Sequence, residues 1–388
     1  MRILLVNETA RCHTGGANRS VVESLGLLAA AGHTVGLAYT DAGASAVSCP
    51  VWRLEGPPPG LAGRRALEEV LREFKPDVAQ VHWGLPPELT GDLMNRAPTC
   101  QFIHDQSWFC SGGDRMGRQY RPCHRPHGLG CLFWHYAQGC GGKRPWGNLE
   151  RWRLTRGRAQ LGRGHRARFQ VASAFMRQGL LENGYLEGRI DVIPLFALPA
   201  EQAEEAEAGL LLAPARLVQG KGMDLAVAAL AHLPPVAWRL AVAGAGAQRG
   251  ELEAAVRRLG VAERVQFLGE LAPPDLDRWY ARAAVVIHPA VRPEPFGLVG
   301  IEAMAHGRPV VAFAGGGTEE WLVDGRTGLV VRQRSAEALG GAIGALLREP
   351  DRARAMGRAG RQRWEDYRAE RFLERVVASF DRCRREWG

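Results

Sequence analysis

Short aliphatic runs alternate with amphipathic helical patterns along most of the chain. In the first half, the predicted strands are 2–6, 34–39, 78–82, 99–104, 168–172 and 190–193, and the predicted helices are 17–31, 63–74 and 173–183. In the second half, the predicted strands are 210–213, 237–243, 264–268, 284–288, 309–313 and 328–331. Such alternation is typical of parallel sheets with crossover helices. The pattern therefore predicts an α/β protein with two doubly wound units.

The alternation stops twice, and these two breaks divide the chain. Residues 105–145 have no regular period and are rich in Gly, Cys, His and aromatic side chains, so they form an insertion in the first domain. Pro194–Gly209 is the expected linker. The domains are therefore expected at 1–195 and 196–366, with a C-terminal helix at 367–388, because 388 residues exceed one ordinary core.

Composition excludes an integral membrane protein. The chain is 46% hydrophobic and 23% charged, and no segment approaches the roughly 18 uninterrupted apolar residues that a spanning helix needs. The first residues suit a buried strand better than a signal peptide. We expect a cytoplasmic protein.

The net charge of +9 favours an anionic partner without identifying it. The stretch 143–168 carries nine Lys or Arg residues against one Glu. This run suits a solvated helix face, a peripheral contact with the anionic inner face of a membrane, or a phosphate-bearing acceptor. Nucleic acid is the weakest alternative, because no recognition motif accompanies the charge.

The segment from Val285 to Ala312 carries the strongest candidate chemistry. A strand ends near His288, a turn with Glu294 follows, and a helix begins at about Gly297. Ligands of open α/β sheets bind at such carboxyl ends of strands. The N–H groups of Phe296, Gly297 and Leu298 at the helix N-terminus would bind anionic or hydroxyl oxygens. Without other support, Glu294 and Glu302 could equally be a capping acid and an ordinary helix glutamate.

This stretch resembles the donor-site segment of family-four retaining glycosyltransferases, in which seven residues separate two glutamates. The resemblance implies that Glu294 contacts the transferred sugar and that Glu302 binds the ribose of the nucleotide. A carboxylate can accept hydrogen bonds from both ribose hydroxyls. The resemblance also implies the GT-B fold, with two Rossmann-like domains facing a cleft and the C-terminal helix packing back on the N-terminal domain.

A second match to this family follows the first strand of the second domain, in Ala213-Pro-Ala-Arg-Leu-Val-Gln-Gly-Lys-Gly. The resemblance implies that Arg216 and Lys221 bind the donor diphosphate. Ala215 stands where the family often has Gly, which leaves the charged groups untouched. Lys221 is one of three lysines in an arginine-rich chain, and a compact ammonium suits a phosphate.

The first domain contributes weaker matches. Gly15 and Gly16 open a helix after the first strand, like the family's N-terminal glycine loop. His104 and Asp105 end a strand where the family commonly has a His-Asp pair beside the donor sugar. The turn 315–317 also resembles a family feature, and its amides could contact the sugar or phosphate.

The insertion carries a cysteine cluster. Cys110, Cys123, Cys131 and Cys140 would suit a structural zinc, although no spacing is the short one of common zinc knuckles. Free thiols and two disulfides remain open. The insertion follows His104, so we expect it to shape the acceptor site, where Asp105 and the ring of Trp108 would contact the acceptor.

Together these residues predict transfer of a sugar from a UDP- or GDP-sugar to a hydroxyl acceptor, with retention at the anomeric carbon. The acceptor could be a glycan, a lipid-linked molecule or a secondary metabolite. Arg216 and Lys221 would stabilise the leaving diphosphate, with His104 and Glu294 beside the sugar and no obligatory cofactor. The alternatives are a sugar-nucleotide epimerase or hydrolase of this fold, and a non-catalytic nucleotide-sugar-binding module.

Overall fold

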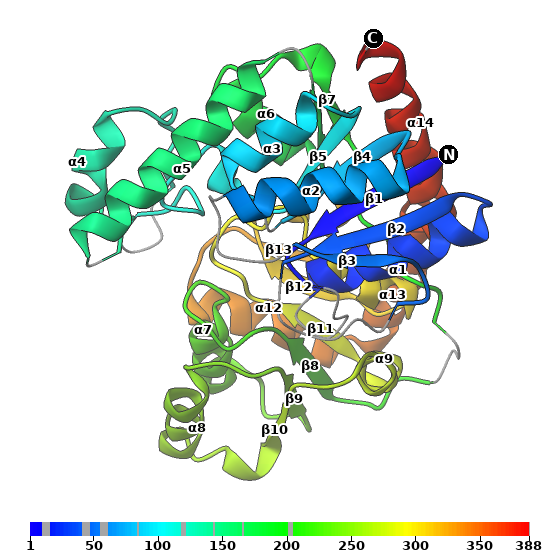
Figure 1. The fold of residues 1–388 in the computed structure, drawn as a ribbon. Helices are drawn as coiled ribbons and strands as arrows, with labels where there is room; N and C mark the ends of the chain where they lie inside the picture. Colours follow the sequence, from blue (N-terminus) through cyan, green and yellow to red (C-terminus); the bar gives the residue numbers. More distant parts are fainter. Residues whose placement is uncertain are drawn as a thin grey trace. The chain divides into compact units, whose positions relative to one another are not determined.

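The computed structural model describes residues 1–388 except 10–15, 41–46, 55–60, 84, 118–121, 143, 165–166, 201–204 and 388. The chain forms two compact units. Unit 1 consists of Met1–Leu195 and Ala369–Gly388, and unit 2 is Phe196–Arg368 (Figure 1). Each unit contains one parallel sheet, so the predicted α/β class with two doubly wound units is confirmed.

Unit 1 has a seven-stranded sheet in the order β3-β2-β1-β4-β5-β6-β7 over its described residues. Its strands are β1 (Arg2–Asn7), β2 (Thr34–Tyr39), β3 (Val51–Arg53), β4 (Val78–Val81), β5 (Thr99–Ile103), β6 (Ala167–Val171) and β7 (Ile190–Val192). All neighbouring strands pair in parallel. The sequence pattern missed β3, because this three-residue edge strand is too short to show a period.

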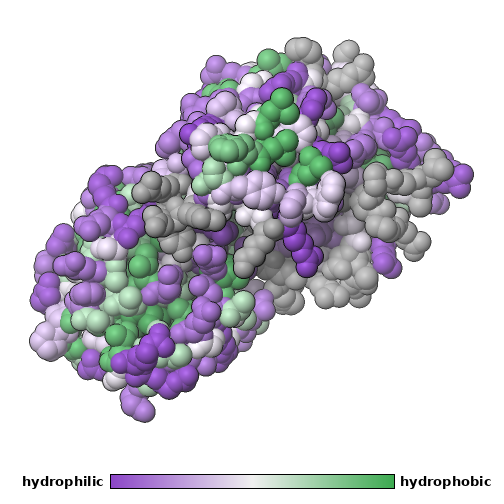
Figure 2. Space-filling model, turned by 90° about the vertical axis from the view of Figure 1, so that its left-hand side faces the viewer, coloured by the Kyte–Doolittle hydropathy of each residue, from purple (hydrophilic) through white to green (hydrophobic). Residues whose placement is uncertain are grey.

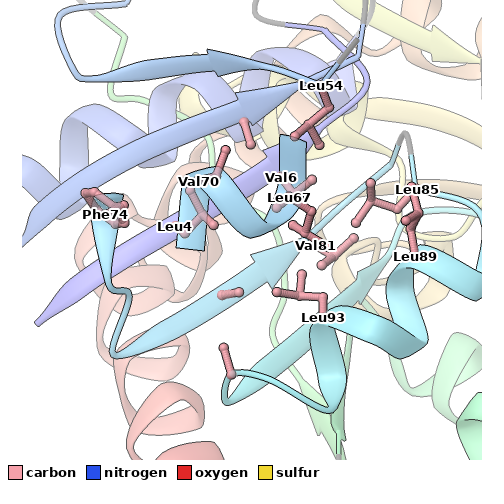
Figure 3. Close-up of a cluster of buried hydrophobic side chains, with 13 residues drawn as sticks. Leu4, Val6, Leu54, Leu67, Val70, Phe74, Val81, Leu85, Leu89 and Leu93 are labelled. Atoms are coloured by element: carbon pink, nitrogen blue, oxygen red, sulfur yellow. The ribbon is translucent and has the colours of Figure 1, made fainter. Parts of the chain in front are cut away.

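The helices of unit 1 pack on this sheet or on one another. They are α1 (Gly16–Ala30), α2 (Leu61–Phe74), α3 (Pro87–Met94), α4 (Gly130–Ala137), α5 (Pro145–Arg163), α6 (Ala174–Leu181) and α14 (Ala369–Trp387), with single 3-10 turns at Gln106–Trp108 and Glu187–Arg189. Figure 3 shows one core cluster, in which Leu4 of β1 and Val81 of β4 lie among Leu67 of α2 and Leu93 of α3. Burial of these apolar side chains holds the two helices on the sheet.

The insertion is more regular than its sequence suggested. It contains α4, and the basic stretch that follows it forms α5. Pro145 starts α5, where a missing N–H costs no hydrogen bond. Trp152, Thr155 and Ala159 form the buried face of α5. Their period was obscured because glycine and arginine residues separate these few inward-facing positions.

The C-terminal helix α14 belongs to unit 1, although it is separated from the rest of that unit by all of unit 2. It packs along β4, β5 and β6. Asp191 of β7 accepts hydrogen bonds from Ser379 at 2.6 Å and from Arg382 at 2.9 Å, both on α14. Arg168 of β6 bonds the same Asp191 through two nitrogens, at 2.8 and 2.9 Å. It also reaches Glu386 on α14 at 2.7 Å.

Unit 2 has a six-stranded sheet in the order β10-β9-β8-β11-β12-β13 over its described residues. Its strands are β8 (Leu210–Pro214), β9 (Arg239–Ala243), β10 (Val265–Gly269), β11 (Val285–His288), β12 (Val310–Phe313) and β13 (Gly328–Val331). Its helices are α7 (Met223–Ala229), α8 (Arg249–Arg258), α9 (Pro273–Arg282), α10 (Leu298–Ala305), α11 (Thr318–Trp321), α12 (Ala336–Arg348) and α13 (Pro350–Trp364). The 3-10 turns are Leu230–His232, Ala262–Arg264 and Glu365–Tyr367. In the described part of the chain, none of the helices combines the length and apolar character that a membrane span requires.

Candidate functional site

The candidate residues of unit 2 lie at one edge of its sheet, where the sequence pattern predicted them. β8 lies between β9 and β11, so the strand order reverses direction between β8 and β11. Arg216 and Lys221 follow β8, and Glu294 follows β11. The carboxyl ends of parallel strands at such a reversal are the usual ligand-binding edge of open α/β sheets.

Backbone contacts join the loop after β8 to the loop after β11. The carbonyl of Gly220 accepts hydrogen bonds from the N–H groups of Val291 and Arg292, each at 3.1 Å. Gly222 has a φ of +69°, and a Cβ there would lie 1.8 Å from the carbonyl oxygen of Pro289. The close approach therefore requires glycine beside Lys221, which fixes the position of that lysine.

Lys221 and Glu294 form an ion pair across the two loops. The Nζ atom of Lys221 lies 2.6 Å from Oε1 of Glu294. Burial alone would raise the pKa of Glu294, but the charges of Lys221 and His288 outweigh it and the net pKa is lowered. The Arg216 guanidinium lowers this pKa as well, so it also lies near the carboxylate. Glu294 is therefore ionised at neutral pH and lies beside the Lys221 ammonium.

His288 is a member of this cluster that the sequence analysis did not select. It is the last residue of β11 and is 5% exposed. Burial lowers the pKa of His288 to about 4, with Glu294 raising it and Lys221 lowering it. Its Nε2 atom is buried without a hydrogen-bond partner among the described residues. The available signal was its place at a strand end directly before the Glu294 motif.

The glycine turn 315–317 supports Glu294 from the other side. Gly317 donates its N–H to the carbonyl of Glu294 at 2.8 Å. A Cβ on Gly316 would lie 2.3 Å from the same carbonyl oxygen, and Gly316 has a φ of +65°. The amide of Gly317 is thus engaged by the Glu294 turn, so this turn positions the glutamate, a role that the sequence analysis did not anticipate.

The helix after Glu294 starts where the sequence predicted. Gly297 precedes α10 with a φ of +95°, and Leu298 is its first residue. The indole of Trp321 donates to the carbonyl of Phe296 at 2.7 Å. The N–H groups at 296–298 therefore lie at a helix N-terminus, where such groups lack intrahelical partners.

Glu302 lies on α10, and Tyr280 of α9 holds it. The Tyr280 hydroxyl donates to Oε2 of Glu302 at 2.8 Å. Tyr280 is 2% exposed, so its hydroxyl is a fixed donor. The role of Tyr280 was not predictable, because nothing in its local sequence pattern separates it from an ordinary core aromatic.

In unit 1, His104 follows β5 and contacts a second histidine. His104 Nε2 lies 2.8 Å from Nδ1 of His82, which follows β4. The Trp83 ring lies 4.5 Å from the His104 ring between centroids. Burial lowers the pKa of His104 to about 3, so its imidazole is neutral at physiological pH. Gly16 is the first residue of α1 and is exposed, whereas Gly15 lies outside the described residues.

The two predicted acceptor residues have structural roles. Asp105 caps the 3-10 turn Gln106–Trp108, and its carboxylate accepts from the Ser107 N–H at 2.8 Å. Trp108 is 6% exposed and packs against Phe169 in a core cluster. The prediction that Trp108 stacks on an acceptor sugar is therefore wrong, because its ring is enclosed by core side chains.

The four cysteines of the insertion are half-buried free thiols. Burial and the neighbouring Cys110, Cys123 and Cys131 raise the pKa of Cys140 to about 11, so the four residues lie near one another. Over the ranges that the structure describes, however, no group of three or more His, Cys, Asp or Glu side chains is arranged to hold a metal ion. Zinc at these cysteines therefore stays a prediction.

The basic stretch 143–168 is not a single surface. Arg168 is buried in the Asp191 network, and Arg158 donates to Ser107 at 2.7 Å. Other arginines of α5, among them Arg153 and Arg156, are exposed. Lys143 lies outside the described residues.

Known protein families match both halves of the chain. Residues 14–196 match Glycosyltransferase Family 4, and residues 197–363 match Glycosyl transferases group 1. One relative is a GDP-mannose-dependent alpha-(1-6)-phosphatidylinositol monomannoside mannosyltransferase of Mycolicibacterium smegmatis, which is 40% identical over 38% of this chain and 40% of its own length. Another is a D-inositol 3-phosphate glycosyltransferase of Nocardia farcinica, which is 39% identical over 44% of this chain and 42% of its own length. The chain thus spans less than half the length of these relatives.

Solved structures agree on the fold. The sucrose-phosphate synthase of Thermosynechococcus elongatus superposes with a TM-score of 0.76 at 22% identity, covering 98% of this chain and 99% of its own. Anabaena HepE, solved with UDP and glucose, has a TM-score of 0.72 at 19% identity over 98% of this chain and 100% of its own. With two Rossmann-like units of the GT-B type and both halves matched, this chain belongs to the family-four, group 1 glycosyltransferases.

Proposed function

We propose that this protein transfers a sugar from a nucleotide-diphosphate sugar to a hydroxyl acceptor. The observation that carries this proposal is the cluster of Lys221, Arg216 and Glu294 at the carboxyl ends of β8 and β11. A cation pair next to an ionised carboxylate suits a substrate with both a diphosphate and a hydroxylated sugar. The ammonium and guanidinium bind phosphate oxygens, and the carboxylate accepts from sugar hydroxyls.

Lys221 and Arg216 would contribute most when the bond to the sugar breaks. Negative charge then grows on the departing diphosphate, and fixed cations stabilise that charge more than they stabilise the bound donor. This electrostatic role requires no divalent metal, so we propose activity without one. Glu294 holds Lys221 in place before the donor binds.

Glu302 would bind the ribose of the donor nucleotide. Tyr280 orients its carboxylate, and a carboxylate can accept hydrogen bonds from both hydroxyls of a ribose. Two curated relatives named as GDP-mannose-dependent mannosyltransferases favour GDP-mannose as the donor to test first. UDP-sugars remain the alternative donors.

We further propose that the anomeric configuration is retained, with the departing phosphate accepting the proton of the acceptor hydroxyl. The family resemblance supports this course. Relatives named for phosphatidylinositol mannosides and inositol 3-phosphate support a polyol acceptor that carries phosphate or lipid. Such an acceptor suits a protein of the cytoplasm that works at the inner face of a membrane, and the exposed arginines within 143–168 support that location.

The experiment that tests this proposal follows donor and acceptor together. The protein is incubated with GDP-mannose or UDP-glucose and with inositol phosphates or phosphatidylinositol, and NMR identifies the products. A new glycoside whose anomeric configuration matches the donor is expected. Donor consumed without a glycoside would instead support the epimerase or hydrolase alternative. Binding of GDP or UDP without turnover across a broad acceptor panel would support the non-catalytic module.

A further inference from the structure

An exposed hydrophobic face lies on α4. The four most exposed large hydrophobic side chains of the described residues all belong to 129–146: Trp146 at 81%, Leu129 at 72%, Phe133 at 65% and Tyr136 at 50%. Leu129, Phe133 and Tyr136 follow the spacing i, i+4 and i+7, which places them on one face of a helix. Solvent-exposed side chains of this size and grouping mark an interaction surface.

The opposite face of α4 is anchored. His135 is buried, and its Nε2 lies 2.8 Å from the hydroxyl of Ser111. The helix therefore cannot turn its apolar face inward without losing this buried contact. In Figure 1, α4 and α5 extend at the left from the sheet of unit 1. Figure 2 views the molecule from that side, where hydrophobic residues gather among hydrophilic ones.

The surroundings of this face are positively charged. No Asp or Glu occurs between Asp114 and Glu150. Arg125 and Arg144 are exposed in this interval, and the Arg125 guanidinium lies 3.8 Å from the centroid of the Trp134 ring. An apolar face that is bordered by cations and lacks acids is complementary to an anionic, amphipathic partner.

A cavity beside the face adds an anion-binding element. It has a volume of about 300 Å³ and is lined by His127, Leu129, Trp152, Arg156 and Arg163, among others. Both arginines are exposed, and no carboxylate pairs with either among the residues that the structure describes. Leu129 lines the cavity and also belongs to the apolar face, so the two elements are continuous. Two guanidinium groups at a cavity of this size suit a phosphate headgroup.

We propose that Leu129, Phe133, Tyr136 and Trp146, together with Arg125, Arg144, Arg156 and Arg163, form a docking surface for an anionic lipid bilayer. We name these residues the α4 docking surface. The apolar side chains enter the region between headgroups and acyl chains, and the arginines contact lipid phosphates. Tyr and Trp suit this depth, because each has an apolar body and a polar tip. The proposal rests on the proposed location at the inner face of a membrane and deepens it by naming the residues that contact the lipid.

The test is binding of the full chain to vesicles, measured by flotation. Vesicles of phosphatidylcholine alone are compared with vesicles that contain phosphatidylglycerol, at low and high salt. We expect binding to the anionic vesicles only, and weaker binding at high salt because ions screen the arginines. The double variant Phe133→Ser/Trp146→Ser and the double variant Arg156→Glu/Arg163→Glu should each weaken binding about tenfold or more.

Matched controls separate this result from misfolding and from the proposed function. Leu259→Ser removes an exposed leucine of unit 2, which is 38% exposed, and should bind vesicles like the unchanged protein. The variants of the α4 docking surface should keep the same thermal unfolding and the same stabilisation by GDP or UDP as the unchanged protein.

Absence of binding to anionic vesicles would overturn the proposal, and so would binding that the folded double variants retain in full. If GDP and UDP fail to raise the thermal stability of the unchanged protein, the proposed function is contradicted, whereas the conclusion from vesicle binding still holds. Equal binding to both kinds of vesicle would exclude the arginine contribution and so would also contradict the surface as proposed.

Discussion

The Nζ atom of Lys221 lies 2.6 Å from Oε1 of Glu294, although 73 positions separate the two residues in the chain. The pair joins the loops that follow two adjacent strands, β8 and β11. It contains one of the chain's three lysines and the first glutamate of the predicted donor motif. When a donor binds at this edge, Lys221 can contact a phosphate and Glu294 a sugar in place of each other. These two charges are therefore the first to test.

Replacing Lys221 with Met should lower kcat/KM for sugar transfer by about 10²-fold or more, the usual loss when one stabilising donor is removed from a transition state. Steady-state kinetics with the identified donor measures this. Lys75→Asn provides the matched control, because Lys75 is an exposed lysine of unit 1 with a φ of +46°, which Asn tolerates. If kcat/KM fell equally in both variants, the loss would reflect the lower net charge of the protein and not a specific contact of Lys221.

Glu302→Gln should weaken binding of GDP or UDP by about tenfold, because a charged acceptor of ribose hydroxyls is replaced by a neutral amide. Comparison of GDP with 2′-deoxy-GDP sharpens the test. The unchanged protein should prefer the ribonucleotide, and Glu302→Gln should lose most of that preference. If Glu302→Gln preferred GDP over 2′-deoxy-GDP as strongly as the unchanged protein does, Glu302 would not be a ribose-binding residue. Tyr280→Phe should give a smaller change in the same direction, since it removes only the orienting hydroxyl.

His104 should remain neutral through the physiological range, because burial lowers its pKa to about 3. NMR of histidine ring protons should therefore show no titration of His104 between pH 5.5 and pH 8. A His104→Gln variant would identify the resonance. A midpoint near the ordinary histidine value of about 6.5 would contradict the buried arrangement with His82.

Acid should weaken the attachment of α14 through Asp191. Burial alone would raise the pKa of Asp191, but hydrogen bonds from Arg168 and Ser379 lower it below its ordinary value. A carboxylate whose folded pKa is depressed stabilises the native state above its unfolded pKa of about 3.9, and this contribution is lost as the pH falls through the folded value.

Thermal unfolding of Asp191→Asn should thus show lower stability at pH 7 and less further loss between pH 5 and pH 3 than the unchanged protein. Removal of one partner from a buried pair costs about 3–5 kcal/mol. Arg371→Ala is the control, because the Arg371–Glu374 pair is exposed on the same helix and contributes little. Parallel pH profiles for the unchanged protein and Asp191→Asn would contradict this role.

Metal analysis should find about one zinc per chain if Cys110, Cys123, Cys131 and Cys140 form the ligand set that their sequence suggests. Cys123→Ser should then lose the metal, whereas Cys49→Ser should keep it. Chelation should lower the thermal stability of the insertion, since a structural zinc contributes directly to folding. Protein purified under reducing conditions with no bound metal and unchanged stability would assign these residues as buried free thiols.

The sequence allowed prediction of both sheets and of most strand bounds to within two residues, since buried parallel strands appear as continuous aliphatic runs. The positions of Arg216, Lys221 and Glu294 after the carboxyl ends of β8 and β11, and of Glu302 on the helix that follows, came from the same pattern. The partners His288 and Tyr280 were not predictable, because their contacts depend on packing between elements distant in sequence.

Elsewhere the local pattern was misleading. Trp108 lies in the short turn after β5, as an acceptor-site residue would, yet its ring packs in the core against Phe169. Gly316 and Gly317 looked like donors to a ligand, but they are glycines because the Glu294 turn approaches them too closely for a side chain. Sequence spacing locates a loop at the correct edge, whereas only packing decides which of its groups face inward.

The assignment of α14 to unit 1 has a consequence for synthesis of the chain. Unit 2 is one continuous segment, 196–368, so all of it is translated before the last helix. Unit 1 begins first and is completed last, since Ser379, Arg382 and Glu386 are needed to satisfy Asp191 and Arg168. Unit 2 therefore emerges from the ribosome ahead of α14, while β6 and β7 still await their partners, and truncation before residue 379 should leave unit 1 prone to aggregation.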